Sequence, residues 1–195
     1  HGYICTATLI DVCACVRACV CVRACCRTAA LAENSTFAMT RAQNTRALQY
    51  TGPGVGPCGR AAVQAGEDCY FYYADTTAAG RVHGDVFTLA YDGRICHSAG
   101  LLVGSLSFLY SMHGFSIGTL RVVDATTGGT LWSLSGEQTG RDEWRNASTQ
   151  VYASAFRFEY VRGATYNSAA AITNVLVGCI HAPPPAPPSP PPNDD

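Results

Sequence analysis

Residues 98–144 read SAGLLVGSLSFLYSMHGFSIGTLRVVDATTGGTLWSLSGEQTGRDEW, and this stretch decides the fold. From Leu102 to Met112, apolar or small residues occupy alternate positions, and serines occupy several of the positions between them. A period of two over this length is typical of a β-strand with one face in the core. The predicted inward face comprises Leu102, Gly104, Leu106, Phe108, Tyr110 and Met112. The predicted outward face comprises Ser105, Ser107 and Ser111.

The second half of this stretch predicts a β-hairpin. Residues 120–124 and 130–134 are rich in Val, Leu, Thr and Trp, which favour strands. Gly128 and Gly129 lie between them, and glycine tolerates the positive φ angles that tight turns need. Two such segments joined by a short glycine-containing turn are typical of paired antiparallel strands.

Four more segments outside this stretch have the composition of strands. In the segment 151–161, we expect Phe156, Phe158 and Tyr160 to face one way and Arg157 and Glu159 the other. The segments are 69–74 (CYFYYA), 86–91 (VFTLAY), 151–161 (VYASAFRFEYV) and 170–177 (AAITNVLV). The sequence therefore predicts an all-β chain with enough inward aromatic residues for a core.

Four motifs occur in a fixed order in the middle of the chain. LSFLYSMHG begins at Leu106, IGTLRV begins at Ile117, LWSLSG begins at Leu131, and Trp144 follows. This set resembles the central signature of MAM domains, which are extracellular modules of receptors, adhesion proteins and secreted proteases. The resemblance covers residues 37–179 and implies a two-sheet antiparallel β-sandwich that is jelly-roll-like.

Smaller matches and departures accompany this resemblance. Phe37–Arg41 and the TGP at Thr51 are similar to family segments, although Met39 stands where the family usually has Trp. The family carries a cysteine where this chain has Ser105, and that cysteine pairs with the terminal one, so Cys179 lacks its usual partner. Some MAM domains bind a cation through acidic loop residues, but the ligands cannot be assigned here. We therefore predict no cofactor and leave a structural cation open.

The chain divides into three parts. Residues 1–30 contain VCACVRACVCVRACC, which admits three interpretations: a thiolate cluster for soft metal ions, an amphipathic strand, or a low-complexity expansion or mistranslated intron. Residues 31–180 hold the MAM-like sandwich. Residues 181–195 read HAPPPAPPSPPPNDD, and such a proline run adopts the extended polyproline II conformation. We interpret this tail as a linker or stalk, as in the proline-rich tracts of plant and algal cell walls.

Cysteine usage and glycosylation motifs predict an extracellular or cell-surface protein. The chain has 11 cysteines, and Asn34 and Asn146 each begin an Asn-x-Ser/Thr motif for a glycan. Asn146 lies in a polar segment, GRDEWRNAST, which we expect to form an accessible loop. The chain starts without an initiator Met or a signal peptide, so we expect an excerpt or a processed product.

Four cysteines within the sandwich region are the candidates for disulfides. They are Cys58, Cys69, Cys96 and Cys179, and four cysteines allow three full pairings. Our preferred bond is Cys69–Cys96, because we expect the two strands between these residues to form a hairpin that brings its ends together.

The sequence offers no set of residues that is typical of an active site. It contains no Gly-x-Ser-x-Gly motif, no His-Glu-x-x-His motif and no phosphate-binding glycine loop. We interpret His83 and Asp85 as turn residues and give Cys96, beside His97, a disulfide role. We therefore predict no catalytic residue, no metal ligand and no enzyme.

The favoured function is a non-enzymatic extracellular module for recognition, adhesion or assembly. Its partners would be extracellular or cell-surface proteins, a second copy of the same module included, or glycans. The alternative is a carbohydrate-binding β-sandwich, and a sandwich-fold secreted enzyme is the second alternative. The net charge of −1 argues against nucleic acid as a partner. No run of the sequence reaches the roughly 18 apolar residues of a membrane span.

Overall fold

The structure is a computed structural model that describes residues 36–43, 51–59 and 69–182. The predictions for residues 1–30, for the glycosylation site at Asn34 and for the proline tail beyond residue 182 lie outside the described residues. None of the described helices is long and apolar enough to cross a membrane.

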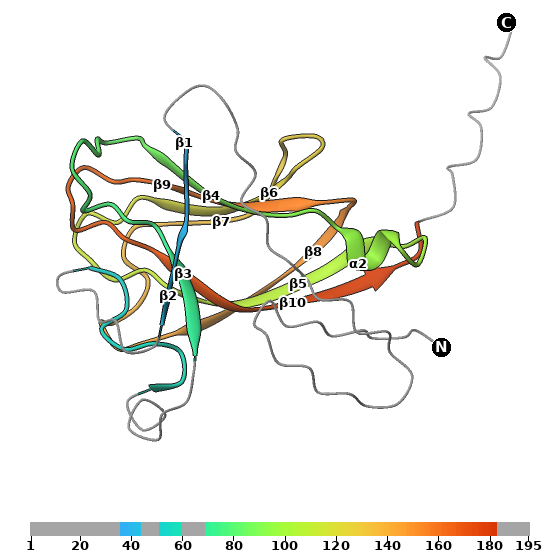
Figure 1. The fold of residues 1–195 in the computed structure, drawn as a ribbon, viewed down its shortest axis with the longest axis horizontal. Coiled ribbons are helices and arrows are strands. Elements are labelled where there is room, and N and C mark those ends of the chain that lie inside the picture. Colours follow the sequence, from blue (N-terminus) through green and yellow to red (C-terminus); the bar gives the residue numbers. More distant parts are fainter. Residues whose placement is uncertain (1–35, 44–50, 60–68, 183–195) are drawn as a thin grey trace, which may run out of the picture.

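The described chain is almost entirely β-structure (Figure 1). The strands are β1 (Thr36–Ala38), β2 (Thr40–Gln43), β3 (Tyr70–Tyr73), β4 (Val86–Tyr91), β5 (Leu102–Ser111), β6 (Thr119–Asp124), β7 (Thr130–Ser135), β8 (Arg145–Ala153), β9 (Phe156–Val161) and β10 (Ala171–Ile180). One short helix, α2 (Arg94–His97), follows β4.

The strands form two five-stranded sheets that pack face to face. Sheet I has the order β1-β4-β9-β6-β7, and sheet II has the order β2-β3-β10-β5-β8. Neighbouring strands are antiparallel except β1 and β4, which are parallel. The predicted all-β sandwich is confirmed.

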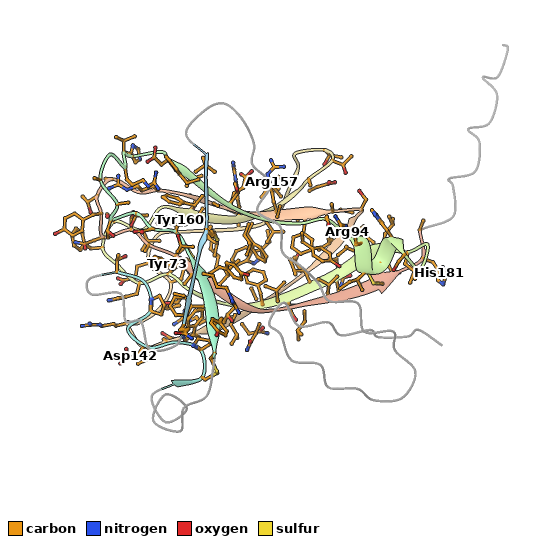
Figure 2. All side chains as sticks on the ribbon, viewed as in Figure 1. Tyr73, Arg94, Asp142, Arg157, Tyr160 and His181 are labelled. Atoms are coloured by element: carbon orange, nitrogen blue, oxygen red, sulfur yellow. A yellow bond between two sulfur atoms is a disulfide. The ribbon has the colours of Figure 1, made fainter. Side chains whose placement is uncertain are left out.

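The core lies between the two sheets and is rich in aromatic rings. Phe158 of sheet I meets Phe108 of sheet II edge to face, with ring centroids 4.9 Å apart. In β9, Phe156, Phe158 and Tyr160 face the core, and Arg157 and Glu159 lie on the opposite side, as predicted. Each buried aromatic ring contributes about 1.5–3 kcal/mol. Figure 2 shows Tyr160 between the sheets and Arg157 outside them.

The prediction for β5 holds for its second half only. Leu106 and Phe108 are buried, but at the start of the strand it is Val103 that enters the core. The pairing with β8 is interrupted between Val103 and Ser105, where β8 contains an extra residue. The pairing with β10 shifts at the same place, because β5 contains the extra residue Gly104 between the partners of Gly178 and Cys179. This irregularity changes the phase of β5, so Leu102 lies off the core face, and Gly104 is buried without a side chain to fill the core.

The predicted hairpin is present as β6 and β7. Asp124 stabilises its turn, because its carboxylate accepts hydrogen bonds from the amides of Thr126 and Thr127. Gly128 has a positive φ of 75°, which glycine adopts without strain.

Two other predictions of strand arrangement are wrong. The strands β3 and β4 do not form a hairpin, since β3 belongs to sheet II and β4 to sheet I. The segment 151–161 is not one strand either, because the chain leaves sheet II after Ala153 and enters sheet I at Phe156. The polar segment expected as a loop, residues 140–149, is a loop only up to Trp144, and from Arg145 onward it is the first half of β8.

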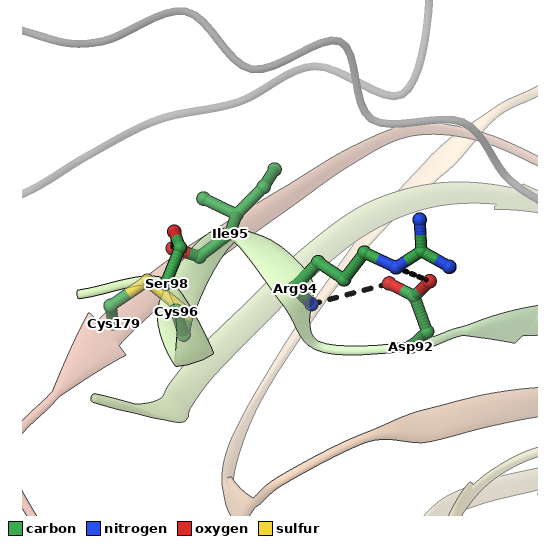
Figure 3. Close-up of a disulfide and its surroundings, with 6 residues drawn as sticks. All are labelled: Asp92, Arg94, Ile95, Cys96, Ser98 and Cys179. Atoms are coloured by element: carbon green, nitrogen blue, oxygen red, sulfur yellow. Dashed lines mark hydrogen bonds and ion pairs between the residues drawn. A yellow bond between two sulfur atoms is a disulfide. The ribbon is translucent and has the colours of Figure 1, made fainter. Parts of the chain in front are cut away.

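The disulfides pair Cys58 with Cys69 and Cys96 with Cys179. Figure 3 shows the Cys96–Cys179 bond between α2 and β10. All four candidate cysteines are therefore bonded, but the preferred Cys69–Cys96 bond is wrong. The reason is that the chain between these two residues changes sheets instead of turning back on itself. Cys96 of α2 takes the place of the partner that the family resemblance left missing for Cys179.

Candidate functional site

Loops from both sheets meet at one end of the sandwich. They are residues 51–59, 75–85, 112–118, 136–144 and 162–170. Figure 1 shows this loop end opposite to α2, and Figure 2 places Asp142 at the loop end and Arg94 and His181 at the other. Four of these loops, all except 51–59, connect strands of the sandwich, so their positions are fixed by the sheets.

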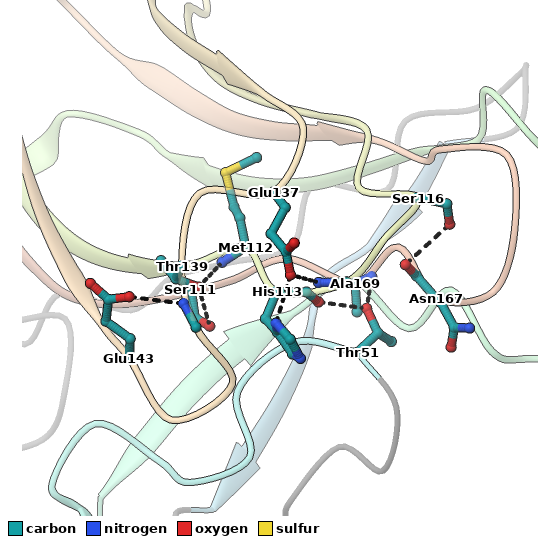
Figure 4. Close-up of polar contacts among 12 residues, drawn as sticks. Thr51, Ser111, Met112, His113, Ser116, Glu137, Thr139, Glu143, Asn167 and Ala169 are labelled. Atoms are coloured by element: carbon teal, nitrogen blue, oxygen red, sulfur yellow. Dashed lines mark hydrogen bonds and ion pairs between the residues drawn. The ribbon is translucent and has the colours of Figure 1, made fainter.

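Thr51 joins three of these loops (Figure 4). Its hydroxyl donates a hydrogen bond to the backbone oxygen of His113 at 3.0 Å and accepts one from the amide of Ala169 at 2.8 Å. The amide of Gly52 donates to the same His113 oxygen at 2.8 Å. These hydrogen bonds hold together three segments that are far apart in the sequence.

Glu137 and Thr139 fix the loop 112–118 from the other side. Glu137 accepts a hydrogen bond from the amide of Gly114 at 3.0 Å, and its Oε1 lies 2.8 Å from His113 Nδ1. Thr139 Oγ1 accepts from the amide of Met112 at 3.0 Å. Glu137 therefore has a structural role in holding this loop.

Tyr160 supports the same loops from inside the core. Its hydroxyl accepts from the amide of Gly118 at 2.9 Å and donates to the backbone oxygen of Ser168. Burial raises the pKa of the Tyr160 phenol, since the charged form would lose its water. The neutral hydroxyl therefore acts as a fixed link between two loops.

Glycines allow the loops 112–118 and 162–170 to touch through their backbones. A methyl group on Gly163 would overlap the backbone oxygen of Ser116, and one on Gly118 would overlap that of Val161. The Ser116 hydroxyl lies 2.6 Å from Thr165 Oγ1. The two loops are thus one closely packed unit.

Two aromatic side chains project into solvent from this unit. Phe115 is 79% exposed and Tyr166 is 54% exposed, and each adjoins a residue of the Ser116–Thr165 contact. Val82, 59% exposed, lies on the adjoining loop 75–85. That loop is attached through Thr76, whose hydroxyl donates to the backbone oxygen of Tyr166 at 3.0 Å. We call Val82, Phe115 and Tyr166 the tip patch.

Carboxylates in the described residues are used mainly for structure. Asp85 accepts from the amide of Val82 at 2.8 Å and closes its turn, as expected for a turn residue. Burial opposes ionisation of Glu159, but hydrogen bonds from Arg157 and Arg121 outweigh it and lower its pKa. No group of three or more His, Cys, Asp or Glu side chains in the described ranges is placed to hold a metal ion.

The predicted site residues are distributed over the sandwich. Asn146 is exposed but lies on the strand β8, so the expected loop around this glycosylation motif is wrong. The four bonded cysteines lie outside the tip patch. Phe71 and Tyr73 are buried beneath Trp144, whose ring centroid lies 5.8 Å from that of Phe71. Two of the four aromatic rings in the segment 70–73 are therefore buried.

Sequence analysis missed the tip patch. The available signal was an aromatic residue inside a run of small polar residues, as in HGFSIG around Phe115 and GATYNS around Tyr166. Alternation does not reveal such residues, because they lie between strands and belong to no face of a sheet.

No family model matches the chain, so the resemblance to MAM domains stays a prediction. Distant similarity exists to solved structures. The K1 cleaved adhesin domain of Lys-gingipain from Porphyromonas gingivalis is 12% identical, with a TM-score of 0.46, over 72% of this chain and 83% of that one. A carbohydrate-binding module of lichenase 5A from Cellvibrio mixtus, in complex with cellotriose, is 12% identical, with a TM-score of 0.36, over 73% of this chain and 88% of that one. At these TM-scores the similarity carries no inference about ligand or activity.

Proposed function

We propose that this chain is a non-enzymatic extracellular recognition module of the MAM type, used in adhesion or assembly and carried on a proline-rich stalk. Its partner is a cell-surface or extracellular protein, a second copy of the module included. The tip patch is the surface that binds. The observation that carries this proposal is the 79% exposure of Phe115 on a loop that is hydrogen-bonded on both sides.

The physical argument rests on the combination of exposure and rigidity. Scattered exposed apolar side chains are ordinary, but the tip patch gathers three of them on adjoining loops. Aromatic residues are frequent centres of binding energy in protein interfaces. Because Gly118 and Gly163 let the loops pack closely, little further ordering is needed when a partner binds.

The disulfides support the extracellular part of the proposal. Two bonds, Cys58–Cys69 and Cys96–Cys179, are present in the described residues. Disulfides form and persist in oxidising environments such as the cell exterior.

The test uses the full chain displayed on beads, with bead clustering and adhesion to surfaces of the source organism as readouts. The variant Phe115→Ser with Tyr166→Ser should reduce adhesion about tenfold or more. Ile180→Ser is the control, because Ile180 is also exposed but lies on the strand β10. Free sugars should leave the adhesion unchanged. Adhesion by a folded double variant at the unmodified level would contradict the proposal.

The proline-rich tail should not contribute to affinity at a single site. Deleting residues 181–195 removes a spacer whose role is to set reach, so one-to-one affinity should stay the same. Clustering of densely coated beads should weaken, since a shorter stalk lowers the chance of multiple contacts. Complete loss of one-to-one binding on this deletion would place the binding site in the tail and refute the assignment to the tip patch.

A further inference from the structure

Tyr152 on β8 combines two unusual properties. Its ring is 57% exposed, and its backbone is in the left-handed region with φ of 50°. A bulky residue in that region costs free energy that glycine would not. Its neighbours Val151 and Ala153 are buried in the core, so the Tyr152 ring projects from the outer side of sheet II.

A bulge in β8 holds Tyr152 in this position. The pairing moves from Gln150 opposite Ser105 to Ala153 opposite Val103, so two residues of β8 face Gly104 alone. Bulges re-aim side chains and are frequent beside functional sites.

A second irregularity occurs across β5. The pairing of β10 with β5 shifts between Thr173 and Leu176, and Asn174 there is exposed with φ of 48°. The outer side of β5 is therefore bordered by two exposed residues in the left-handed conformation, one aromatic and one amide.

The surface between them is uncharged and mostly polar. We call it the sheet II platform, and it comprises Ser105, Ser107, Ser148, Gln150, Tyr152 and Asn174, together with the half-buried Leu176, which pairs with Ser107. By contrast, the outer side of sheet I carries the ionic cluster of Arg121, Glu159 and Arg157. The two outward faces of the sandwich thus have different chemistry.

We infer that the sheet II platform binds a neutral oligosaccharide, with one sugar ring stacked on Tyr152. This goes beyond the proposed function, because it uses another surface and another class of ligand than the tip patch.

Three features of the platform fit this ligand. An exposed aromatic ring offers an apolar face to the C–H side of a sugar and a hydroxyl at its edge. The amides of Gln150 and Asn174 each carry donors and an acceptor, which matches sugar hydroxyls that both give and accept hydrogen bonds. None of these positions carries a charge, so the platform cannot form an ion pair with an acidic sugar and favours a neutral one. From Asn146 to Tyr152 the strand advances about 20 Å, the length of a short oligosaccharide.

The glycosylation motif at Asn146 bears on the test. Asn146 and Ser148 are exposed on the same strand, so a glycan attached there would begin at one end of the platform. Asn146→Gln removes the motif and keeps an amide. Binding is therefore measured in both the unmodified chain and this variant.

The experiment is calorimetric titration of the full chain with cellohexaose, laminarihexaose and mannohexaose, and with hexagalacturonate as the charged control. Tyr152→Gly removes the ring at a position where glycine suits the backbone, so the fold should persist. We expect this variant to weaken binding of a neutral probe about tenfold or more, and Tyr152→Trp to retain it. Phe115→Ser should leave sugar binding unchanged.

Binding of a neutral probe to Asn146→Gln that is lost with Tyr152→Gly supports the inference. Absence of binding to all neutral probes in both forms overturns it, as does equal affinity for hexagalacturonate. Loss of sugar binding in Phe115→Ser with retention in Tyr152→Gly would move the sugar to the tip patch and also overturn it. Adhesion by the tip patch is measured separately, so either proposal can fail alone.

Discussion

The two disulfides should contribute unequally to stability, and the size of the difference follows from the loops that they close. The sequence separation is 83 residues for Cys96–Cys179 and 11 residues for Cys58–Cys69. In the chain-entropy description, cross-links over these separations stabilise the fold by about 4.5 and about 2.8 kcal/mol. Removing the longer-range bond should therefore cost about 1.8 kcal/mol more.

Urea unfolding of two double variants measures this difference. Cys96→Ala with Cys179→Ala removes the long-range bond, and Cys58→Ala with Cys69→Ala is the matched control. With an m-value of about 2 kcal/mol per molar, the two midpoints should differ by about 1 M. Cys96 is also buried in the core, so its truncation adds to the loss.

The reasoning fails if the two variants unfold at the same urea concentration, or if the control is the less stable of the two. Either result would mean that the loop closed by Cys58–Cys69 stabilises through native contacts rather than through loop entropy. Measuring the unmodified chain with and without reductant separates the loss of both bonds from the effect of the alanines.

Further predictions concern single side chains. Trp132→Ala should lower the free energy of unfolding by about 3 kcal/mol in urea titration and weaken binding only through unfolding, because the ring packs against the core. Gly163→Ala should cost about 1–3 kcal/mol by forcing a methyl against the Ser116 carbonyl, measured by thermal unfolding. The pKa of Glu159 is lowered from its ordinary value of 4.5, so its charged form stabilises the fold above that pH. The difference in unfolding free energy between the unmodified chain and Glu159→Gln should therefore shrink as the pH falls below 4.5, measured by acid titration. Glycopeptide mass spectrometry of the natively secreted protein should find a glycan on the exposed Asn146.

The sequence predicted which side chains face the core better than which strands pair. Phe156 and Phe158 were assigned correctly, because alternation is a local property that each strand displays in its own residues. Pairing depends on partners that are distant in the chain, and alternation is silent about them. The bond expected between Cys69 and Cys96 failed for this reason, since neighbouring strand segments joined different sheets.

A change of phase in the alternation of buried and exposed residues indicates where a strand is irregular or where the chain changes sheets. In the segment 151–161, the buried apolar and aromatic residues are odd-numbered up to Ala153 and even-numbered from Phe156. In β5, Val103 is buried out of phase with Leu106. A strand that remains in one sheet keeps its phase unless a bulge intervenes. The change of phase in 151–161 is visible in the sequence and marks the change of sheet. In β5 it is hidden, because Leu102 is apolar and in phase with Leu106, so only the structure reveals that irregularity.

The proposed binding surfaces are hard to predict for a different physical reason. Phe115 and Tyr152 are of residue types that usually lie in the core, and only the fold reveals that neither is buried. Five large apolar or aromatic side chains are exposed in the described residues, and they lie in two regions of the fold. Val82, Phe115 and Tyr166 lie on adjoining loops at one end, whereas Tyr152 and Ile180 lie on sheet II. The first group lies on loops that hydrogen bonds hold in place, and Tyr152 lies on a bulge with a strained backbone. The fold therefore keeps these side chains exposed at both places. Packing within the domain does not explain their exposure, and the proposed binding of a partner does.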